Sequence, residues 1–395
     1  MRFEPGAPAP EGSIPLCVPE IRGNEWEYIK ECLDTNWVSS VGSFVDRFEQ
    51  SIADFVGVDH AVATVNGTSA LHTALLIAGV EPDDEVLVST LTFVAPAAAI
   101  RYAGAWPVFM DAEPIHWQMD PDKVREFLET ACVWRDGQLF NKTTGRRVKA
   151  VLPVHILGHP CDMNPIVEVA RRFDLALIED AAESLGSKYR GANTGSMGDV
   201  SCFSFNGNKL ITSGGGGMVV TDKQEWADRA RYLTTQAKDD PIEYVHNEIG
   251  YNYRLSNIQA AMGVAQMEQI ESYIEKKRAI ARAYENGLGD HSEITLMAER
   301  EGTESAYWLN TVLLGPDITL EERMQVVSDL IDDGIGVRPL WHPIHSLPPY
   351  ADCQAFRIEH ADDLYRRGVS LPSSVGLEAE EQQRCIAALV KRLAG

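Results

Sequence analysis

Short, nearly continuous apolar runs alternate with helical patterns from about residue 61 to residue 221. Such runs are typical of strands that are covered on both faces, and therefore of a largely parallel sheet. The helices between them carry start signals, such as Asn164-Pro165 before the periodic segment 166–173. This alternation predicts an α/β layered domain. The expected strands are 61–65, 85–88, 106–110, 148–154, 175–178, 200–205 and 218–221.

Two regions depart from this alternation. Between residues 117 and 149, a predicted helix at 121–131 is followed by the turn sequences Asp136-Gly137 and Thr144-Gly145, which predict a small hairpin inserted on the surface. After residue 221 the pattern becomes helical, and segment 256–259 has the form of a capping box that opens one long helix. The apolar face of that helix comprises Ile258, Met262, Ala265, Ile270 and Ile274.

We therefore expect a large domain over residues 1–255, which includes the insert at about 117–149. Residues 256–395 would form the linking helix and a smaller C-terminal α+β domain, with strands at 307–314 and 336–340. A chain of 395 residues is long enough for both domains.

Composition narrows the class of protein. A hydrophobic content of 45% and a charged content of 24% are ordinary for a soluble globular protein, and no run approaches the length of a membrane span. The net charge of −23 argues against nucleic-acid and anionic-membrane partners. Seven cysteines without a CxxC pair suit reduced thiols, and the start, Met1 to Gly6, lacks the apolar stretch of a secretion signal. We expect a cytoplasmic protein.

Lys209 and Asp180 are the first candidates for chemistry. Lys209 lies in a mostly apolar segment that runs into four glycines at 214–217, where a lysine amine can be desolvated and made nucleophilic. Asp180 closes an apolar run, where a carboxylate can hold a protonated ring nitrogen. These are the two groups that pyridoxal phosphate requires, a Schiff-base lysine and an acidic partner for its pyridinium nitrogen. Alone, each has a plainer interpretation, as a solvated lysine and as a helix cap.

Segment 65–75 predicts a phosphate site, because it leaves a strand and opens a helix. Backbone N–H groups and hydroxyls at Gly67, Thr68 and Ser69 would meet an anion at the positive end of that helix. Ser204 could add a hydroxyl to the same phosphate, and Phe93 could stack on a flat ring. The alternatives are a capped turn, a backbone-bonded strand serine and a core aromatic residue.

No metal site is predicted. The histidine, cysteine and aspartate residues of segment 155–162 include metal-ligand types, but Gly158 and Pro160 would break a helix that aligned them, and their spacing matches no zinc motif. The glycines at 214–217 are not followed by the residues of a P-loop. They are interpreted as positions of close backbone approach or unusual dihedral angles beside Lys209.

With these groups present, the chain resembles the sugar aminotransferases of the DegT/DnrJ/StrS family, which are fold-type I pyridoxal-phosphate enzymes. The resemblance covers nearly the whole length. Fold-type I implies a large domain with a mostly parallel central sheet flanked by helices, and a smaller C-terminal domain. The motifs that carry the resemblance are segments 66–71, 179–186, 203–209 and 250–256.

The resemblance implies roles for several residues. Lys209 would form the Schiff base and Asp180 would pair with the pyridine nitrogen. Gly67, Thr68 and Ser204 would hold the phosphate, and Phe93 would stack on the ring. Asn252 would reach the phosphate of the neighbouring subunit's cofactor, which implies a homodimer with shared active sites. Glu183 stands near the cofactor hydroxyl and the substrate, where many members have glutamine or histidine; a structural hydrogen bond is the alternative.

Two further features look like the LegC-type branch of this family, whose members aminate C4 of nucleotide-linked 4-keto-6-deoxy-hexoses that carry a 2-acetamido group. They are the insert at 141–145 and segment 336–345. Arg338 offers a cationic fork for a diphosphate, and Trp341 offers a flat face for a sugar or base. His342 belongs to a loop that we expect to line the cleft. Trp37 could line the same cleft, and core packing is its alternative.

The implied reaction moves an amino group from glutamate to C4 of such a keto sugar, for bacterial surface glycans or nonulosonic-acid-type sugars. A free Lys209 would shuttle the proton between cofactor and sugar. Two alternatives remain. A relative could act at C3 or on a carbocycle, and a catalytically silent relative could bind the cofactor or nucleotide sugar as a regulatory protein.

Overall fold

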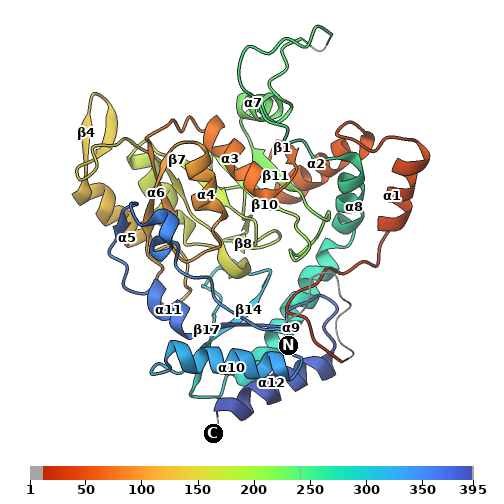
Figure 1. Ribbon diagram of the computed structural model, residues 1–395, viewed down its shortest axis with the longest axis vertical. Coiled ribbons are helices and arrows are strands. Elements are labelled where there is room, and N and C mark those ends of the chain that lie inside the picture. The colour runs from red at the N-terminus through yellow and green to blue at the C-terminus, as the bar shows by residue number, and fades with distance from the viewer. Residues whose placement is uncertain (1–11, 241, 394–395) are drawn as a thin grey trace.

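A computed structural model describes residues 12–240 and 242–393 of the chain. Its upper part in Figure 1 is built on an eight-stranded sheet with the strand order β1-β11-β10-β7-β6-β2-β3-β16. Strand β11 runs antiparallel to both of its neighbours, whereas every other adjacent pair is parallel. The predicted, mostly parallel central sheet is confirmed. Its strands are β1 His60–Thr64, β2 Glu85–Ser89, β3 Trp106–Met110, β6 Val148–Leu152, β7 Ala176–Asp180, β10 Val200–Ser204, β11 Gly217–Thr221 and β16 Ala355–Phe356.

Helices cover both faces of the sheet, as the continuous apolar runs predict. Successive strand residues point to opposite faces: Val86 and Val88 of β2 join one core cluster, and Leu87 between them joins another. One face is covered by α3 Gly67–Ile77, α4 Ala95–Tyr102 and α7 Gln224–Thr234. The other is covered by α2 Ser43–Val56, α5 Pro121–Glu126, α6 Met163–Arg172 and α8 Asn257–Met267, and α1 Glu25–Asp34 packs on α8.

The predicted surface hairpin is present. Strands β4 Cys132–Arg135 and β5 Gln138–Asn141 pair antiparallel and project at one side of the molecule in Figure 1. The helix before them begins as α5 and continues as one π-helical turn, Phe127–Ala131. Short strands also form a separate three-stranded sheet, which consists of β8 Lys188–Tyr189, β9 Ala192–Asn193 and β13 Thr303–Glu304.

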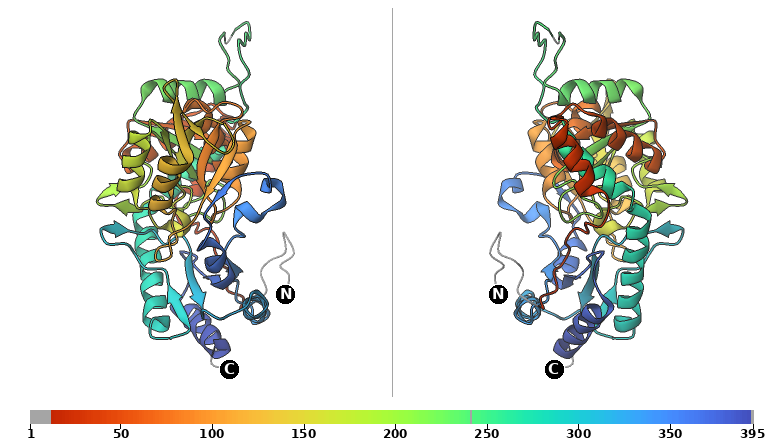
Figure 2. Two further views of the ribbon diagram at one scale, coloured as in Figure 1. Left: turned by 90° about the vertical axis from the view of Figure 1, so that its left-hand side faces the viewer. Right: turned by 90° about the vertical axis from the view of Figure 1, so that its right-hand side faces the viewer.

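The C-terminal part forms a second, smaller α+β layer below the large sheet (Figures 1 and 2). Its sheet has the order β12-β14-β17-β15, with every pair antiparallel. The strands are β12 Ile294–Leu296, β14 Asn310–Leu314, β15 Arg338–Pro339 and β17 Gly368–Leu371. The helices are α9 Ile270–Leu288, α10 Leu320–Asp332, α11 Ala361–Arg367 and α12 Ala379–Leu393. Three short 3₁₀ turns, Ile156–Gly158, Ile344–Ser346 and Pro348–Tyr350, complete the helical elements described here.

The prediction of one long linking helix from residue 256 is wrong. The capping box is present, since the Ser256 side chain accepts the Gln259 N–H and the Gln259 side chain returns to the Ser256 backbone. However, α8 ends at Met267, and α9 begins at Ile270. Gln269 between them has φ −110° and ψ −2°, far from regular helical values. The side chains of Asn24 and Tyr28 donate hydrogen bonds to Glu268, which ties this junction to α1 and its N-cap.

The chain between β15 and α11 makes an excursion across the larger part. It leaves the small sheet at Arg338–Pro339, adds β16 to the edge of β3, and returns to α11. The prediction that concerns a secretion signal falls on residues 1–6, which lie outside the described residues. Among helices within 12–240 and 242–393, none has the length and apolar character needed to cross a bilayer.

Candidate functional site

Three strands of the large sheet end at one edge, and each brings a predicted site residue to it. Asp180 is the last residue of β7, and Ser204 is the last residue of the adjacent parallel strand β10. Strand β1 ends at the same edge and leads directly into α3, whose first residue is Gly67. In open α/β sheets, ligands bind outside the carboxyl ends of the strands.

A cavity of about 460 Å³ lies at this edge, between the large sheet and the small C-terminal sheet. The large part supplies its inner wall, and β15 with the following residues supplies the opposite wall. The lining residues are Leu16, Asn66, Gly67, Thr68, Leu71, Thr92, Phe93, Ala95, Pro96, Val154, Asp180, Ala182, Glu183, Ser204, Asn206, Asn208, Lys209, Gly215, Gly216, Trp308, Leu309, Arg338, Pro339, Leu340, Trp341 and Ser370.

The structure thus brings nine of the predicted residues into one cavity. They are Gly67, Thr68, Phe93, Asp180, Glu183, Ser204, Lys209, Arg338 and Trp341. Four others do not line it. Ser69 is buried within the first turn of α3, where its N–H donates to the Asn66 side chain, and Trp37 is 56% exposed on the surface. The ring of His342 packs against Tyr365 at 4.7 Å and its Nδ1 bonds to the Ser346 hydroxyl, while Asn252 is exposed beside Thr235.

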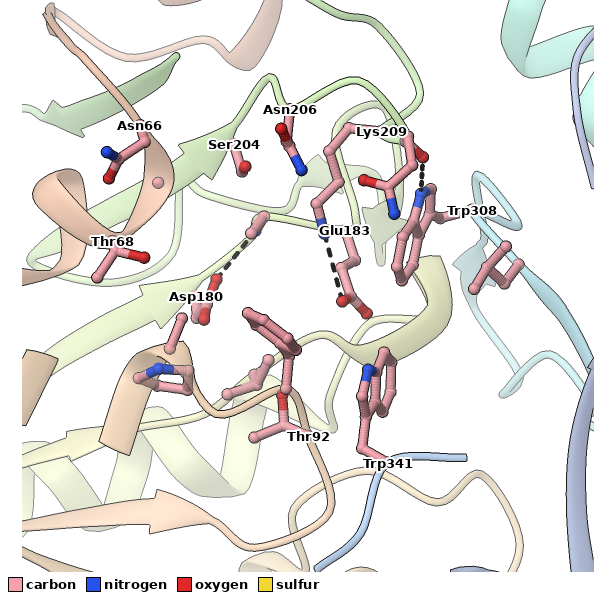
Figure 3. A pocket seen from close by; sticks show the side chains of 18 of the residues that line it. Asn66, Thr68, Thr92, Asp180, Glu183, Ser204, Asn206, Lys209, Trp308 and Trp341 are labelled. Carbon is pink, nitrogen blue, oxygen red and sulfur yellow. Dashed lines mark hydrogen bonds and ion pairs between the residues drawn. The ribbon is translucent and has the colours of Figure 1, made fainter. Parts of the chain in front are cut away.

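Lys209 projects into the cavity from the turn between β10 and β11. The backbone N–H of Lys209 donates to the carbonyl of Asn206, which closes this turn. Its Nζ lies 3.4 Å from Glu183 Oε1 and 4.0 Å from the centre of the Trp308 ring (Figure 3). The glycines that follow serve the predicted purpose, since Gly214 and Gly216 adopt φ of +75° and +140°.

Two buried carboxyl groups face the Lys209 amine. Asp180 and Glu183 are 3% and 6% exposed. Burial raises the pKa of Asp180, and a hydrogen bond from the Ala182 N–H and the positive charge of Lys209 oppose that rise. Burial likewise raises the pKa of Glu183, against the attraction of Lys209 and a hydrogen bond from the Leu157 N–H. Because burial disfavours the negative charge of both carboxyl groups, a further cationic hydrogen-bond donor beside them would be favourable. A protonated ring nitrogen would be such a donor.

The opposite end of the cavity has the features of an anion site. Asn66 is the N-cap of α3, and its side chain accepts the Ser69 N–H at 2.8 Å. The first amides of the helix, at Gly67 and Thr68, have no intrahelical acceptor and face the cavity. A Cβ on Gly67 would lie 2.8 Å from the Ser204 Cβ, so glycine is what allows this helix end to approach the Ser204 hydroxyl.

This donor set fits pyridoxal phosphate. The Lys209 amine and the buried Asp180 carboxyl group lie in one part of the cavity. The N-terminus of α3 and the Ser204 hydroxyl lie in another, and Phe93, 54% exposed, supplies a ring at the cavity wall. Within the described residues there is no group of three or more histidine, cysteine, aspartate or glutamate side chains that could hold a metal ion.

Glu179, next to Asp180, is a structural neighbour of the site. Its buried carboxylate accepts the N–H groups of Gly195, Met197 and Gly198 and also bonds to Ser201 and His155. These bonds fix the loop after β9 against the end of β7. Glu179 thereby holds the strand end that presents Asp180, without lining the cavity itself.

Sequence reasoning missed Asn66, Asn206, Asn208 and Trp308 as cavity residues. The first three lie inside motifs already recognised, so their position next to Gly67 and Lys209 was an available signal. Trp308 gave no such signal, because a tryptophan in an apolar strand pattern is ordinarily core. It reaches the cavity from the segment before β14, almost a hundred positions along the chain from Lys209.

Comparisons with known proteins agree with this geometry. The model of the DegT/DnrJ/EryC1/StrS aminotransferase family matches residues 19–390. A GDP-perosamine synthase of Caulobacter vibrioides is 40% identical over 377 residues, which are 95% of this chain and 97% of that protein. The putative pyridoxal phosphate-dependent aminotransferase EpsN of Bacillus subtilis is 38% identical, over 95% of each chain. A crystal structure of DesI in the presence of its TDP-sugar product superposes with a TM-score of 0.85 at 29% identity, over 98% of this chain and 95% of that one.

Proposed function

The chain belongs to the DegT/DnrJ/EryC1/StrS aminotransferase family and has its fold-type I architecture, and from this premise we propose a substrate and a set of residue roles. The enzyme transfers the amino group of glutamate to C4 of a nucleotide-linked 4-keto-6-deoxy-hexose, with pyridoxal 5′-phosphate as cofactor. The observation that carries the proposal is the convergence of Lys209, Asp180 and the start of α3 on one cavity. Two of the similar proteins, a GDP-perosamine synthase and DesI with its TDP-sugar product, support a nucleotide-linked sugar.

The residues have distinct tasks in this proposal. Bound pyridoxal phosphate supplies an aldehyde that reacts with amines and a ring that accepts electrons. Asp180 keeps the ring nitrogen protonated, and Gly67, Thr68 and Ser204 bind the phosphate. The Lys209 amine would hold the cofactor covalently, and as a free amine it would accept and return a proton at its Nζ.

The small-domain wall supports a nucleotide-linked substrate. Arg338 presents a guanidinium at the cavity, and Trp341 presents an indole there. A guanidinium binds a diphosphate in bidentate fashion, and an indole face packs on a sugar or base. Since the chain carries a net charge of −23, an anionic substrate needs such a local cation. A 2-acetamido group at C2 remains the proposed substituent, and a 2-hydroxyl sugar is the competing substrate.

A colour change tests the cofactor half of the proposal. The protein reconstituted with pyridoxal phosphate should show a visible absorbance band, which glutamate removes. The Lys209→Ala variant should lose turnover completely while it retains part of the cofactor affinity through its phosphate contacts. Near-normal turnover by that variant would contradict the assignment, and so would a reconstituted wild-type protein without the band; the second result would favour a silent binding protein.

A substrate panel tests the other half. UDP-, GDP- and dTDP-linked 4-keto-6-deoxy-hexoses, with and without a 2-acetamido group, are incubated with glutamate beside the corresponding 3-keto sugars and a carbocyclic ketone, and the position of the new amine is determined by NMR. We expect the new amine at C4. An amine at C3 of a 3-keto sugar, or turnover of a carbocyclic ketone alone, would overturn the substrate assignment and leave the cofactor assignment intact.

We also propose that the active unit is a homodimer with shared sites. Asn252, assigned to a neighbouring subunit's phosphate, is exposed and does not line the cavity of its own chain. That placement supports a role in trans, which the exchange experiment described in the Discussion tests.

A further inference from the structure

Trp308 contacts the Lys209 side chain through the face of its ring. The indole is buried, at 4% exposure, and Lys209 Nζ lies 4.0 Å from its ring centre. The face of an indole carries negative electrostatic potential and attracts a cation, most strongly when both groups are removed from water. Glu183 Oε1 lies 3.4 Å from the same nitrogen (Figure 3). The amine is therefore held between a ring face and a carboxylate.

Both holding groups are themselves fixed by hydrogen bonds to the backbone. Trp308 Nε1 donates to the carbonyl of Asn208 at 2.6 Å, and the carbonyl of Trp308 accepts from the buried Lys277 Nζ at 2.7 Å. Glu183 Oε2 accepts the Leu157 N–H at 2.8 Å. Trp308 also lies parallel to Trp341, with ring centres 6.2 Å apart. Such anchoring to the backbone makes the position of the indole independent of the conformation of the Lys209 side chain.

We infer that Trp308 is a positioning residue that holds the free Lys209 amine against Glu183. The inference rests on the proposed function, in which glutamate displaces this amine and leaves it on a flexible four-carbon stem. A lysine side chain without such contacts samples many rotamers, and most of them move Nζ away from the position where it can transfer the proton. The indole adds no hydrogen bond to the amine, so it restricts the position of the amine and leaves the hydrogen-bonding positions of Nζ free for the proton transfer.

The contact has a spectroscopic signature that depends on geometry alone. The full-length protein without cofactor is methylated on its lysines with ¹³C-formaldehyde and a mild reductant, and the Lys209 signal is identified by its absence from Lys209→Arg. Because the amine lies over the indole face, ring current should shift its methyl resonance upfield of exposed lysines. In Trp308→Leu the signal should return to the exposed position, and Trp308→Phe should give a smaller shift.

The chain contains a matched control. Lys223 Nζ lies 4.0 Å from the ring centre of Trp226 on α7, in a contact of the same kind away from the cavity. Trp226→Leu should move the Lys223 signal and leave both the Lys209 signal and turnover unchanged. A shift of the Lys209 signal in Trp226→Leu would mean that the signal does not report the proposed contact.

Kinetics separate positioning from a purely structural role. In the glutamate half-reaction, followed by loss of the visible band, Trp308→Leu should slow the maximal rate by about 10- to 30-fold. Its glutamate concentration for half-maximal rate and its cofactor content should stay as in wild type, and Trp308→Phe should recover part of the rate.

The inference is overturned by an unshifted Lys209 resonance in the wild type, or by a Trp308→Leu rate equal to wild type. Equal losses in rate, glutamate affinity and cofactor content would assign Trp308 a structural role instead. If Trp308→Leu fails to fold, the Lys209 resonance of the wild type and the behaviour of Trp308→Phe still test the positioning role. If the proposed function itself fails, Lys209→Ala retains turnover, while the resonance test is unaffected.

Discussion

Asp180 shows how burial at a strand end prepares one carboxyl group for a cationic partner. It is 3% exposed, and its side chain accepts a hydrogen bond from the Ala182 N–H. Because burial raises its pKa, the group is protonated at a higher pH than an exposed aspartate. A protonated ring nitrogen placed against it would restore the carboxylate form, so cofactor binding and Asp180 ionisation should be linked.

Replacement of Asp180 by asparagine removes the charge and keeps the shape. A hydrogen bond to a charged group contributes about 1.5–3 kcal/mol, so Asp180→Asn should weaken cofactor binding by roughly 10- to 100-fold. Wild-type affinity should fall as the pH is lowered through the raised pKa of Asp180, since protonation removes the partner of the ring nitrogen, and the variant should lose that dependence. Fluorescence titration with pyridoxal phosphate between pH 5 and 8 measures both effects. An affinity profile that is the same in variant and wild type would contradict the role.

At this scale, the sequence predicted which residues lie together where the candidates fall in short segments. Asp180, Ser204 and Lys209 stand at or just beyond strand ends, so the predicted sheet alone brings them together. Trp308 depends on how the small sheet packs on the large one, which no local pattern encodes. For the same reason His342 was expected at the cleft, yet its ring turns towards Tyr365 of α11.

At the scale of elements, the excursion between β15 and α11 fixes one wall of the cavity. Asp111, fully buried after β3, accepts the N–H groups of Glu359, His360 and Ala361, and Lys123 Nζ donates to it at 2.6 Å. The returning chain is thereby pinned to the large sheet. Nearer the cavity, the N–H of Ile344 donates to the carbonyl of Thr90, two residues before the cavity residue Thr92.

Loss of this anchor should lower stability. Asp111→Ala removes the acceptor of four backbone N–H groups and one of the partners of the buried Lys123 amine, which keeps Glu359 and the Arg357 carbonyl. The variant should reduce the free energy of unfolding by about 3 kcal/mol or more. Asp122→Ala on the same helix as Lys123 is the control, because its pair with Arg125 is largely exposed and contributes about 0–1 kcal/mol. Urea denaturation measures both variants. An Asp111→Ala midpoint equal to that of the control would show that the anchor does not hold the fold.

The same anchor predicts a pH dependence. Burial alone would raise the pKa of Asp111, but hydrogen bonds from Lys123 and the backbone outweigh it and hold the pKa below its usual value. A depressed acid pKa stabilises the fold above the unfolded value of about 4 and loses that effect as the pH falls through the folded value. The stability difference between wild type and Asp111→Ala should therefore be constant from pH 7 to 5 and shrink only below about pH 4. A difference that shrinks already between pH 7 and 5 would assign it to another group.

Elements were predictable to the extent that periodicity defines them. The strands of the large sheet and the inserted hairpin follow from alternation and turn residues. The break between α8 and α9 did not, because the apolar face continues across it, with Ile270 and Ile274 in helical register, and the residues that fix the junction come from the segment around α1. Strand β16 has two residues and is defined by its partner β3.

At the scale of the whole molecule, a segment with exposed apolar side chains projects away from the rest of the described chain. The segment after α7 projects above the large sheet in all views (Figures 1 and 2). Its side chains include Ile242, Tyr244 and Ile249, which are 86%, 65% and 84% exposed. Asn252, assigned to a second subunit's site, follows at its base. Large exposed apolar patches on soluble proteins mark interaction surfaces, and here a second copy of the chain is the expected partner.

Charges on this protrusion should dissociate the dimer. Ile242→Asp combined with Ile249→Asp places two carboxylates where an apolar interface is expected, and burial of an unpaired charge is strongly unfavourable. Size-exclusion chromatography with light scattering should show a dimer for wild type and a monomer for the double variant. Leu320→Asp, on an exposed side chain of the small domain, should remain dimeric. A double variant with wild-type mass would exclude the protrusion from the interface.

If the active sites are shared between subunits, two inactive variants should complement each other in a mixed dimer. Lys209→Ala lacks the amine in its own cavity, and Asn252→Ala lacks the group proposed to reach the partner's cavity. In a mixed dimer, one cavity would combine Lys209 from one chain with Asn252 from the other, and the second cavity would lack both. Unfolding and refolding the two variants together should therefore restore part of the turnover that each lacks alone. If each cavity were completed by its own chain, no mixed dimer would contain an intact site, and turnover would stay at the level of the separate variants.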